Sequence, residues 1–256
     1  MDAELGNRAM YITAKKLLGK TEEQFIRSLS HNYPLVAADG VSDRQIQAWR
    51  DCYGVLRGAF RSLPEAFGDL WVVFEYVLPH HAPWTKKFRE EIHIRSDVIL
   101  VSKDTALVLE FKQHDKPYAG AYHQAVKYQT RLERFHAESS GMRVEAALIV
   151  TKANDLRDRF EGVPGCSPDQ LPSVLKEVFG EAPDRHPDIR RWLDSAFVRN
   201  DQIDRRKGVI YGLSLSSGTR ISPHDPVLKQ RGKADRHDFA QERRVYDRHP
   251  KLDGQI

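Results

Sequence analysis

The chain has 256 residues, a length that corresponds to one large domain or to one domain with appendages. Hydrophobic residues make up 40% and charged residues 30%, which allows a sizeable core and excludes a collagen-like or wholly disordered chain. The apolar runs are far shorter than the ~18 residues of a membrane span, and the first residues do not resemble a signal peptide. We therefore expect a soluble, cytoplasmic protein with no membrane partner.

The formal net charge of +4 is concentrated near the C-terminus, because residues 201–256 hold twelve Lys or Arg against eight Asp or Glu. A basic segment of this kind is able to contact nucleic acid, whereas the balanced remainder argues against broad nonspecific coating. The two cysteines, Cys52 and Cys166, form no CxxC pair. This spacing excludes a disulfide scaffold, a cysteine zinc site and a four-cysteine iron–sulfur cluster.

Residues 1–66 predict a helical N-terminal extension that packs on the core. Thr21 has the character of a helix N-cap. A second helix is predicted to begin at Ser42, with Gln45 three residues later as a capping box, and its apolar stripe ends before Pro64. The simplest interpretation of this second helix is packing.

From residue 71 onwards, short runs rich in β-forming residues replace the helical pattern. The predicted strands are 71–78, 97–101, 106–111 and 145–150. Between the last two, apolar residues recur at helical spacing over about 119–138. This order of elements predicts an α/β fold with a central mixed β-sheet flanked by helices.

The remaining segments complete the predicted organisation. Residues 162–172 are rich in Gly and Pro and predict a loop, with helices near 172–179 and 187–198. We therefore expect a core with a helical appendage over 67–207. Residues 208–256 are expected to form a basic, poorly ordered tail.

One predicted hairpin carries the candidate chemistry. If Val101 faces Ala106, the same register places Asp97 opposite Glu110, with Lys112 following on the same face. Two opposed carboxylates repel each other, and a divalent cation such as Mg²⁺ would neutralise them. Alternatively, the carboxylates mark the solvent-exposed strand ends and Lys112 forms an ion pair with one of them.

Two further features support a site near this hairpin. Glu75 interrupts an otherwise apolar strand, where a carboxylate is costly to bury unless it is paired or near a metal. Gln124 and Tyr128 lie one helical turn apart and can orient a lysine or a water. The alternatives are an edge-strand Glu75 facing solvent and an ordinary half-buried helix.

In this order, the residues resemble the PD-(D/E)xK, or restriction-endonuclease-like, nuclease superfamily. Ser96-Asp97 stands at the position of the "PD" pair, and Glu110-Phe111-Lys112 stands at that of "ExK". Gln124 and Tyr128 match the QxxxY helix of the RecB-like and Cas4-like branch. The local sequence is most similar to the N-terminal nuclease domains of bacterial nuclease–helicase fusions, whose helicase half is Schlafen-like.

The resemblance implies a restriction-endonuclease-like fold and a metal-dependent deoxyribonuclease. The implied ligands of Mg²⁺ or Mn²⁺ are Asp97, Glu110, the Phe111 carbonyl and Glu75. The implied catalytic set is Asp97, Glu110, Lys112, Glu75, Gln124 and Tyr128. Within it, Lys112 would position the attacking water and stabilise the phosphate, while Gln124 and Tyr128 would orient the lysine or the DNA backbone.

The sequence departs from the family pattern in three ways. Ser96 replaces the proline of the motif, which is a mild change because that proline binds nothing. The cysteine quartet of the iron–sulfur version is absent, and so is a helicase. Residues 208–220 have the look of a strand and glycine loop but lack the lysine of a phosphate-binding loop. A helicase, ATPase or defence-system subunit would therefore be a separate partner.

Basic residues offer a route for DNA. Lys127, Arg131 and Arg134 recur along one face of the helix that carries Gln124 and Tyr128. Lys86 and Lys87 lie beside aromatic residues, a mixture that can grip a backbone and stack on a base. A solvated surface is the alternative for both groups.

We thus expect a metal-dependent DNA nuclease, in phage (antiviral) defence or in DNA repair and processing. The first alternative is a non-catalytic module on the same fold that binds nucleic acid or a partner protein, and it predicts binding that survives EDTA. The second alternative is a junction resolvase, which predicts a dimer that prefers four-way junctions.

Overall fold

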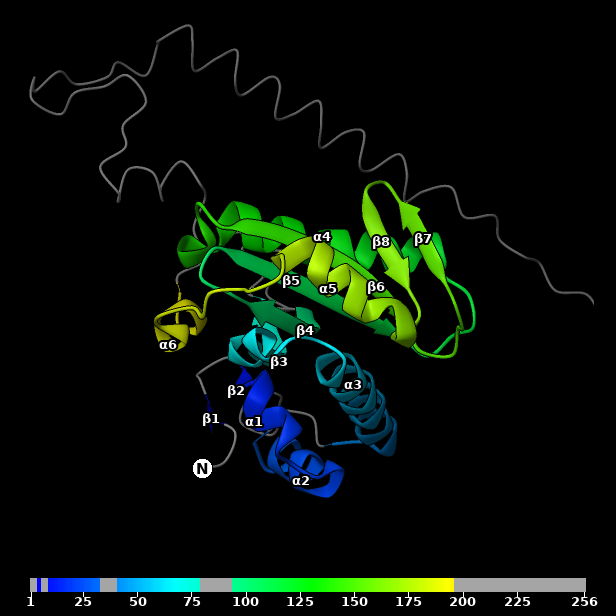
Figure 1. Ribbon diagram of the computed structural model, residues 1–256, viewed down its shortest axis with the longest axis horizontal. Coiled ribbons are helices and arrows are strands. Elements are labelled where there is room, and N and C mark those ends of the chain that lie inside the picture. The colour runs from blue at the N-terminus through cyan, green and yellow to red at the C-terminus, as the bar shows by residue number, and fades with distance from the viewer. Residues whose placement is uncertain (1–3, 6–8, 33–40, 79–93, 196–256) are drawn as a thin grey trace, which may run out of the picture. The chain divides into compact units, whose positions relative to one another are not determined.

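Eight strands form a single mixed sheet in the computed structural model (Figure 1), which describes residues 4–5, 9–32, 41–78 and 94–195. The strands are β1 (Glu4–Leu5), β2 (Met10–Thr13), β3 (Trp71–Leu78), β4 (Ile94–Val101), β5 (Thr105–Lys112), β6 (Arg143–Val150), β7 (Arg157–Phe160) and β8 (Val163–Cys166). Their order is β1-β2-β3-β4-β5-β6-β8-β7. The pairs β5–β6 and β6–β8 are parallel and the others are antiparallel. The predicted mixed α/β fold is thus confirmed.

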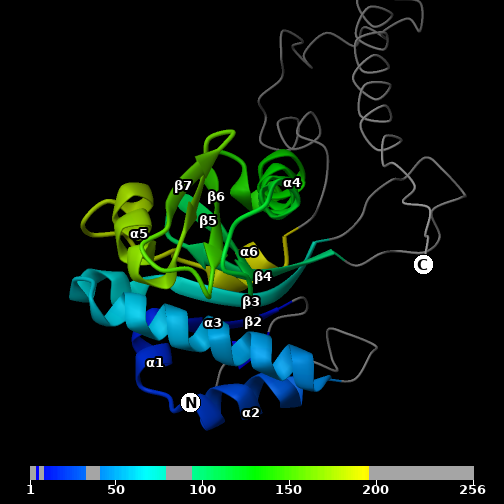
Figure 2. The same cartoon turned by 90° about the vertical axis from the view of Figure 1, so that its right-hand side faces the viewer.

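Helices cover both faces of this sheet. The α-helices are α1 (Ala14–Leu18), α2 (Glu22–Asn32), α3 (Asp43–Arg61), α4 (Ala119–Phe135), α5 (Leu171–Phe179) and α6 (Ile189–Leu193). Short 3₁₀ helices are η2 (Glu65–Asp69), η3 (Ala137–Ser139) and η4 (Pro168–Gln170). In Figure 2, α3 lies on one side of the sheet and α4 on the other. One core cluster joins α1, α2, α3 and α5 to the first face, and a second joins α4 and α6 to the opposite face.

The sequence predicted most of these elements. The strand over 71–78 has the predicted bounds, and β4, β5 and β6 extend their predicted runs by one to three residues at one end or both. The Ser42 hydroxyl accepts a hydrogen bond from the Gln45 N–H at the start of α3, as the N-cap prediction requires. A reciprocal capping box occurs instead at α2, where Thr21 and Gln24 each accept from the other's backbone N–H.

The N-terminal extension is not wholly helical, contrary to the prediction for residues 1–66. Met10–Thr13 forms β2, which pairs antiparallel with β3. All four residues of β2 are buried, so the run shows no alternation of apolar and polar residues. A four-residue buried run cannot be assigned by periodicity, which is why the strand was missed.

The prediction of a loop over 162–172 was also wrong. Val163–Cys166 forms β8, parallel to β6, and pairs with β7 across the two-residue turn Glu161-Gly162. Both turn residues have positive φ, 49° and 88°, as a type I′ hairpin requires. Pro164 and Gly165 inside the strand concealed it, because both residues are typical of loops.

The remaining observations concern the ends and the cysteines. Cys52 and Cys166 are both buried, and neither is in a disulfide. Among the described residues, no helix is long and apolar enough to cross a membrane. The predicted tail, 208–256, lies outside the described residues.

Candidate active site

The site begins where β4 separates from β5. The two strands pair from Val101–Ala106 to Val98–Leu109, in the predicted register, and the pairing ends there. Beyond that point β4 continues beside β3, and the Asp97 carboxylate accepts a hydrogen bond from the Phe111 N–H at 2.8 Å. Asp97 therefore satisfies a backbone donor of β5 through its side chain, and the strands part at the predicted acidic pair.

Glu110, Lys112, Gln124 and Tyr128 form a continuous chain of hydrogen bonds on the α4 side. The Lys112 Nζ donates to Glu110 Oε1 at 2.5 Å and to Gln124 Oε1 at 3.1 Å. The Gln124 Nε2 then donates to the Tyr128 hydroxyl at 2.7 Å. Glu110 is only 1% exposed, and its second oxygen, Oε2, has no hydrogen-bond partner among the described residues. Gln124 thus orients Lys112 directly and Tyr128 does so through Gln124. One Glu110 oxygen is buried and receives no hydrogen bond from the described part of the chain.

Glu75 occupies an unusual backbone position in β3. Its φ is +53°, whereas Phe74 and Tyr76 on either side pair regularly with Val98 and Ser96. Glu75 therefore lies across from Asp97. The left-handed residue interrupts the alternation of the strand, because Phe74 packs in the α3-side core and Tyr76 in the opposite one. A non-glycine residue in this conformation is a strained feature of the kind concentrated at functional sites.

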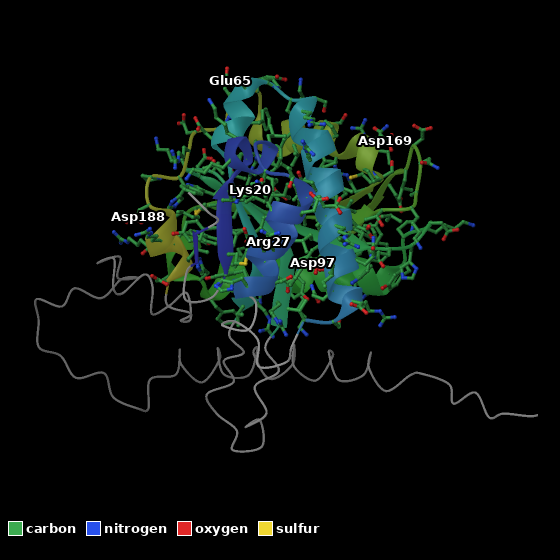
Figure 3. All side chains as sticks on the ribbon, turned by 90° about the horizontal axis from the view of Figure 1, so that it is seen from below. Lys20, Arg27, Glu65, Asp97, Asp169 and Asp188 are labelled. Atoms are coloured by element: carbon green, nitrogen blue, oxygen red, sulfur yellow. The ribbon has the colours of Figure 1, made fainter. Side chains whose placement is uncertain are left out.

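Two side chains of α3 hold Glu75 in place. Its Oε1 accepts hydrogen bonds from the Trp49 Nε1 and from the Gln45 Nε2, both at 2.9 Å. Glu75 and Asp97 also line the same small cavity, of about 70 Å³, against the N-terminal half of α3. Figure 3, which labels Asp97, shows it beside this helix. The alternative interpretation of Glu75, as an edge-strand carboxylate that faces solvent, is wrong, because Glu75 is only 8% exposed.

Sequence reasoning missed Gln45 and Trp49 as site residues. Gln45 stands where a capping box places its side chain at the start of the helix, and Trp49 belongs to the apolar stripe. In the structure the Gln45 amide turns to Glu75 instead of capping α3. One signal in the sequence could have identified Trp49. The indole N–H of a buried tryptophan needs a hydrogen-bond acceptor, and Glu75 was a carboxylate in an apolar strand with no partner assigned to it.

Burial raises the pKa values of all three carboxyl groups of the site. Burial raises the pKa of Glu110 to about 8, with the Asp97 charge adding to the effect. Burial raises the pKa of Glu75 to about 7, partly offset by the Trp49 hydrogen bond. Burial also raises the pKa of Asp97, although the Phe111 N–H works against it. For Lys112, burial opposes the charged form, but Glu110 outweighs it and the pKa is raised. Without a cation, the site therefore disfavours full ionisation of its carboxyl groups.

This donor set fits a hard divalent cation, although the ligands are few. No cluster of three or more His, Cys, Asp or Glu that could hold a metal occurs among the described residues. Mg²⁺ usually takes one or two carboxylates and keeps several waters, so Asp97 and Glu110 suffice in number. Glu110 Oε2, buried and without a hydrogen-bond partner in residues 9–32, 41–78 and 94–195, is the observation that favours a cation, because such an oxygen is costly without a partner.

The predicted DNA-binding residues are only partly described. On α4, Lys127 and Arg134 are exposed and Arg131 is half-buried. Burial and the neighbouring Arg131 charge lower the pKa of Lys127, as expected for adjacent cations. Lys86 and Lys87 lie outside the described residues.

Comparisons with known proteins do not assign a function to this chain. No protein-family model matches the chain, and no curated protein is significantly similar to it. The arrangement of the carboxylates, Lys112 and the α4 amide is therefore the basis for the function proposed below.

Proposed function

We propose that the protein is a metal-dependent nuclease that hydrolyses phosphodiester bonds of DNA. The observation that carries the proposal is the buried Glu110, which binds Lys112 through one oxygen, while the other has no partner within the part of the chain that the structure describes. The nearby Asp97 and Glu75 add negative charge that a cation would balance. This combination of carboxylates and a restrained lysine also matches the PD-(D/E)xK resemblance of the sequence.

The residues would divide the chemistry as follows. Asp97, Glu110 and the Phe111 carbonyl would hold Mg²⁺ or Mn²⁺, with Glu75 in support from across the strands. When bound, the cation would supply positive charge beside the scissile phosphate. Hydrolysis joins a water oxygen to phosphorus and breaks the bond from phosphorus to the leaving sugar oxygen.

Lys112 acts as a charged donor in this scheme. Because Glu110 raises its pKa, Lys112 keeps its proton at neutral pH and does not serve as the general base. Its ammonium can instead orient the water or stabilise the negative charge that develops on the phosphate. Gln124 fixes its direction, and Tyr128 in turn fixes Gln124.

The α4 helix also offers a path for the substrate backbone. Lys127, Arg131 and Arg134 recur along the helix that carries Gln124, so phosphates bound there would run past the lysine. Contacts of this kind to phosphates do not distinguish one base sequence from another. A role in phage defence or DNA repair, with a separate helicase, ATPase or defence-system subunit as partner, is the biological extension of this proposal.

The decisive experiment is a cleavage assay on linear and circular DNA, single- and double-stranded, with Mg²⁺, Mn²⁺ or EDTA. We expect metal-dependent cleavage by the wild type and a loss of at least about 100-fold in Lys112→Ala, as for a lost transition-state donor. Lys103→Ala is the matched control, because that side chain is 64% exposed and pairs only loosely with Asp184. Its activity should equal that of the wild type.

The alternative, a non-catalytic module, gives the opposite pattern. Neither variant nor wild type would then cleave, and both would bind nucleic acid or a partner equally in EDTA. That result would overturn the nuclease proposal.

A further inference from the structure

Two buried oxygen atoms near the candidate site have no hydrogen-bond partner among the described residues. One is Glu110 Oε2, and the other is the hydroxyl of Ser96, a side chain that is fully buried. A buried polar atom without a partner is costly, and most such atoms in folded proteins are paired with protein groups or with ordered water. The proposed chemistry uses Glu110 but gives no role to Ser96.

Both side chains lie on the α4 side of the sheet. Ser96 of β4 pairs with Tyr76 of β3, and residues paired across two strands point to the same face. Tyr76 packs in the core cluster that contains the buried residues of α4. Glu110 pairs with Leu148 of the same cluster. The two oxygens without partners therefore belong to the same layer of the molecule.

The strands that carry these two residues are neighbours that separate at this level. The last pair of β4 and β5 is Val98–Leu109, so Ser96 lies two residues beyond that pair and Glu110 lies one residue beyond it. The two side chains form no direct hydrogen bond with each other. A water molecule can satisfy both, because a buried water requires about two to four polar partners.

Tyr128 supplies a third polar group on this face. Lys112 has only donors, so the Gln124 oxygen faces it and the Gln124 amino group faces Tyr128. The Tyr128 hydroxyl accepts that bond, and its own hydrogen has no acceptor among the described residues. Burial raises the pKa of Tyr128, and the Glu110 charge adds to the effect because the two groups lie close together. One acceptor and two donors thus lack partners in this region.

We propose that Ser96 is a positioning residue that holds a buried water against Glu110 Oε2. The Ser96 and Tyr128 hydroxyls donate to the water, and the water donates to the Glu110 oxygen. The inference rests on the proposed nuclease function, because the carboxylate that the water orients is the one that would bind the cation. Mg²⁺ usually keeps several waters, so the water and the cation are compatible. Ser96 stands where the resembled motif has proline, which has no side-chain donor, so the role belongs to this chain's own sequence.

The sign of the stability change in Ser96→Ala tests for the water. If the Ser96 hydroxyl had no partner in the protein, its removal would leave the protein equally stable or more stable. Because the hydroxyl holds the water, we expect the equilibrium constant of unfolding in EDTA to rise by at least about fivefold. Urea denaturation of the metal-free protein measures this constant. A Ser96→Ala protein that is at least as stable as the wild type would overturn the inference.

Mg²⁺ affinity tests whether the water positions Glu110. We expect titration calorimetry to show binding at least about tenfold weaker in Ser96→Ala than in the wild type, as for other groups that orient a metal ligand. Ser102→Ala is the matched control, because Ser102 is a buried serine just past the other end of β4 and bonds to Asp104 and Thr105. It should lose stability but bind Mg²⁺ as the wild type does. Equal affinity in the wild type and Ser96→Ala would overturn the positioning role.

A crystal structure of the metal-free wild type gives the direct observation. We expect one water within hydrogen-bonding distance of both the Ser96 hydroxyl and Glu110 Oε2, and no such water in crystals of Ser96→Ala. An empty position in the wild type, or a Ser96 hydroxyl bonded to another protein group, would overturn the inference. Failure of the nuclease proposal has a different signature. The wild type would then bind no Mg²⁺ and cleave no DNA, whereas the stability and crystallographic measurements of the water need no metal.

Discussion

At the scale of single residues, Glu75 combines two features that destabilise the folded protein, an unfavourable backbone conformation and a buried carboxyl group. Its backbone is left-handed, its side chain is buried, and its pKa is raised to about 7. In the unfolded chain the same carboxyl ionises near 4.5. Between about pH 4.5 and pH 7 the Glu75 carboxyl is ionised in the unfolded chain but keeps its proton in the folded protein. In the absence of a cation, the free energy of unfolding therefore falls as the pH rises through this range.

This asymmetry predicts the effect of Glu75→Gln. The amide oxygen can still accept from Trp49 and Gln45, but the buried charge is gone. In EDTA at pH 8 we expect the variant to be more stable than the wild type, by up to about 3 kcal/mol, and nearly equal to it at pH 5. Urea denaturation at the two pH values measures this difference. A variant that is less stable than the wild type at pH 8 would contradict the argument.

At the scale of elements, the sequence predicted the strands and helices whose period is clear. The hairpin register, the α4 helix and the order of acidic residue, ExK and QxxxY were all readable, because apolar alternation and helical spacing are local signals. The left-handed Glu75 and the partnership of Gln45 and Trp49 with it were not readable. They depend on how α3 crosses the sheet, and residues 26 to 30 positions apart in the chain carry no local signal of contact. The β7–β8 hairpin was missed for a different reason, since its Pro and Gly imitate a loop.

The same hairpin positions α4 through Gly165. A Cβ at Gly165 would lie 1.9 Å from the Tyr122 hydroxyl and 2.7 Å from its Cζ. Tyr122 is buried, stacks on Phe160 and donates to Asp158, so the ring has little room to move. Gly165 is thus a place where a side chain of α4 must approach the strand closely.

We therefore expect Gly165→Ala to destabilise the protein by about 1–3 kcal/mol through overpacking. The double variant Gly165→Ala, Tyr122→Phe should recover part of this loss, because it removes the closest atom and leaves the ring carbon. Urea midpoints of the two single variants and the double variant measure the coupling. A Gly165→Ala protein as stable as the wild type would show that Tyr122 moves aside freely.

At the scale of the whole molecule, the site joins two layers that pack independently. Glu75 is held by α3 on one face, whereas Glu110 and Lys112 are held by α4 on the other. Between them the β4 and β5 strands separate, and Asp97 spans the gap to the Phe111 backbone. The three carboxyl groups, on β3, β4 and β5, thus meet at one place in the sheet. Ionising all three at once is unfavourable, and a cation would relieve that cost.

This arrangement predicts that Mg²⁺ stabilises the folded protein as a whole. A ligand at 100 times its Kd contributes about 2.7 kcal/mol, which for a chain of this size raises Tm by about 5–10 °C. We expect this rise in scanning calorimetry at pH 8, and a much smaller rise in Glu110→Gln, because the neutral amide is a weaker cation ligand than a carboxylate. At pH 5 the raised pKa values of Glu110 and Glu75 leave both carboxyls protonated, so Mg²⁺ should have little effect. An equal rise in the wild type and Glu110→Gln would place the bound ion elsewhere, and the buried Glu110 Oε2 would then need another explanation.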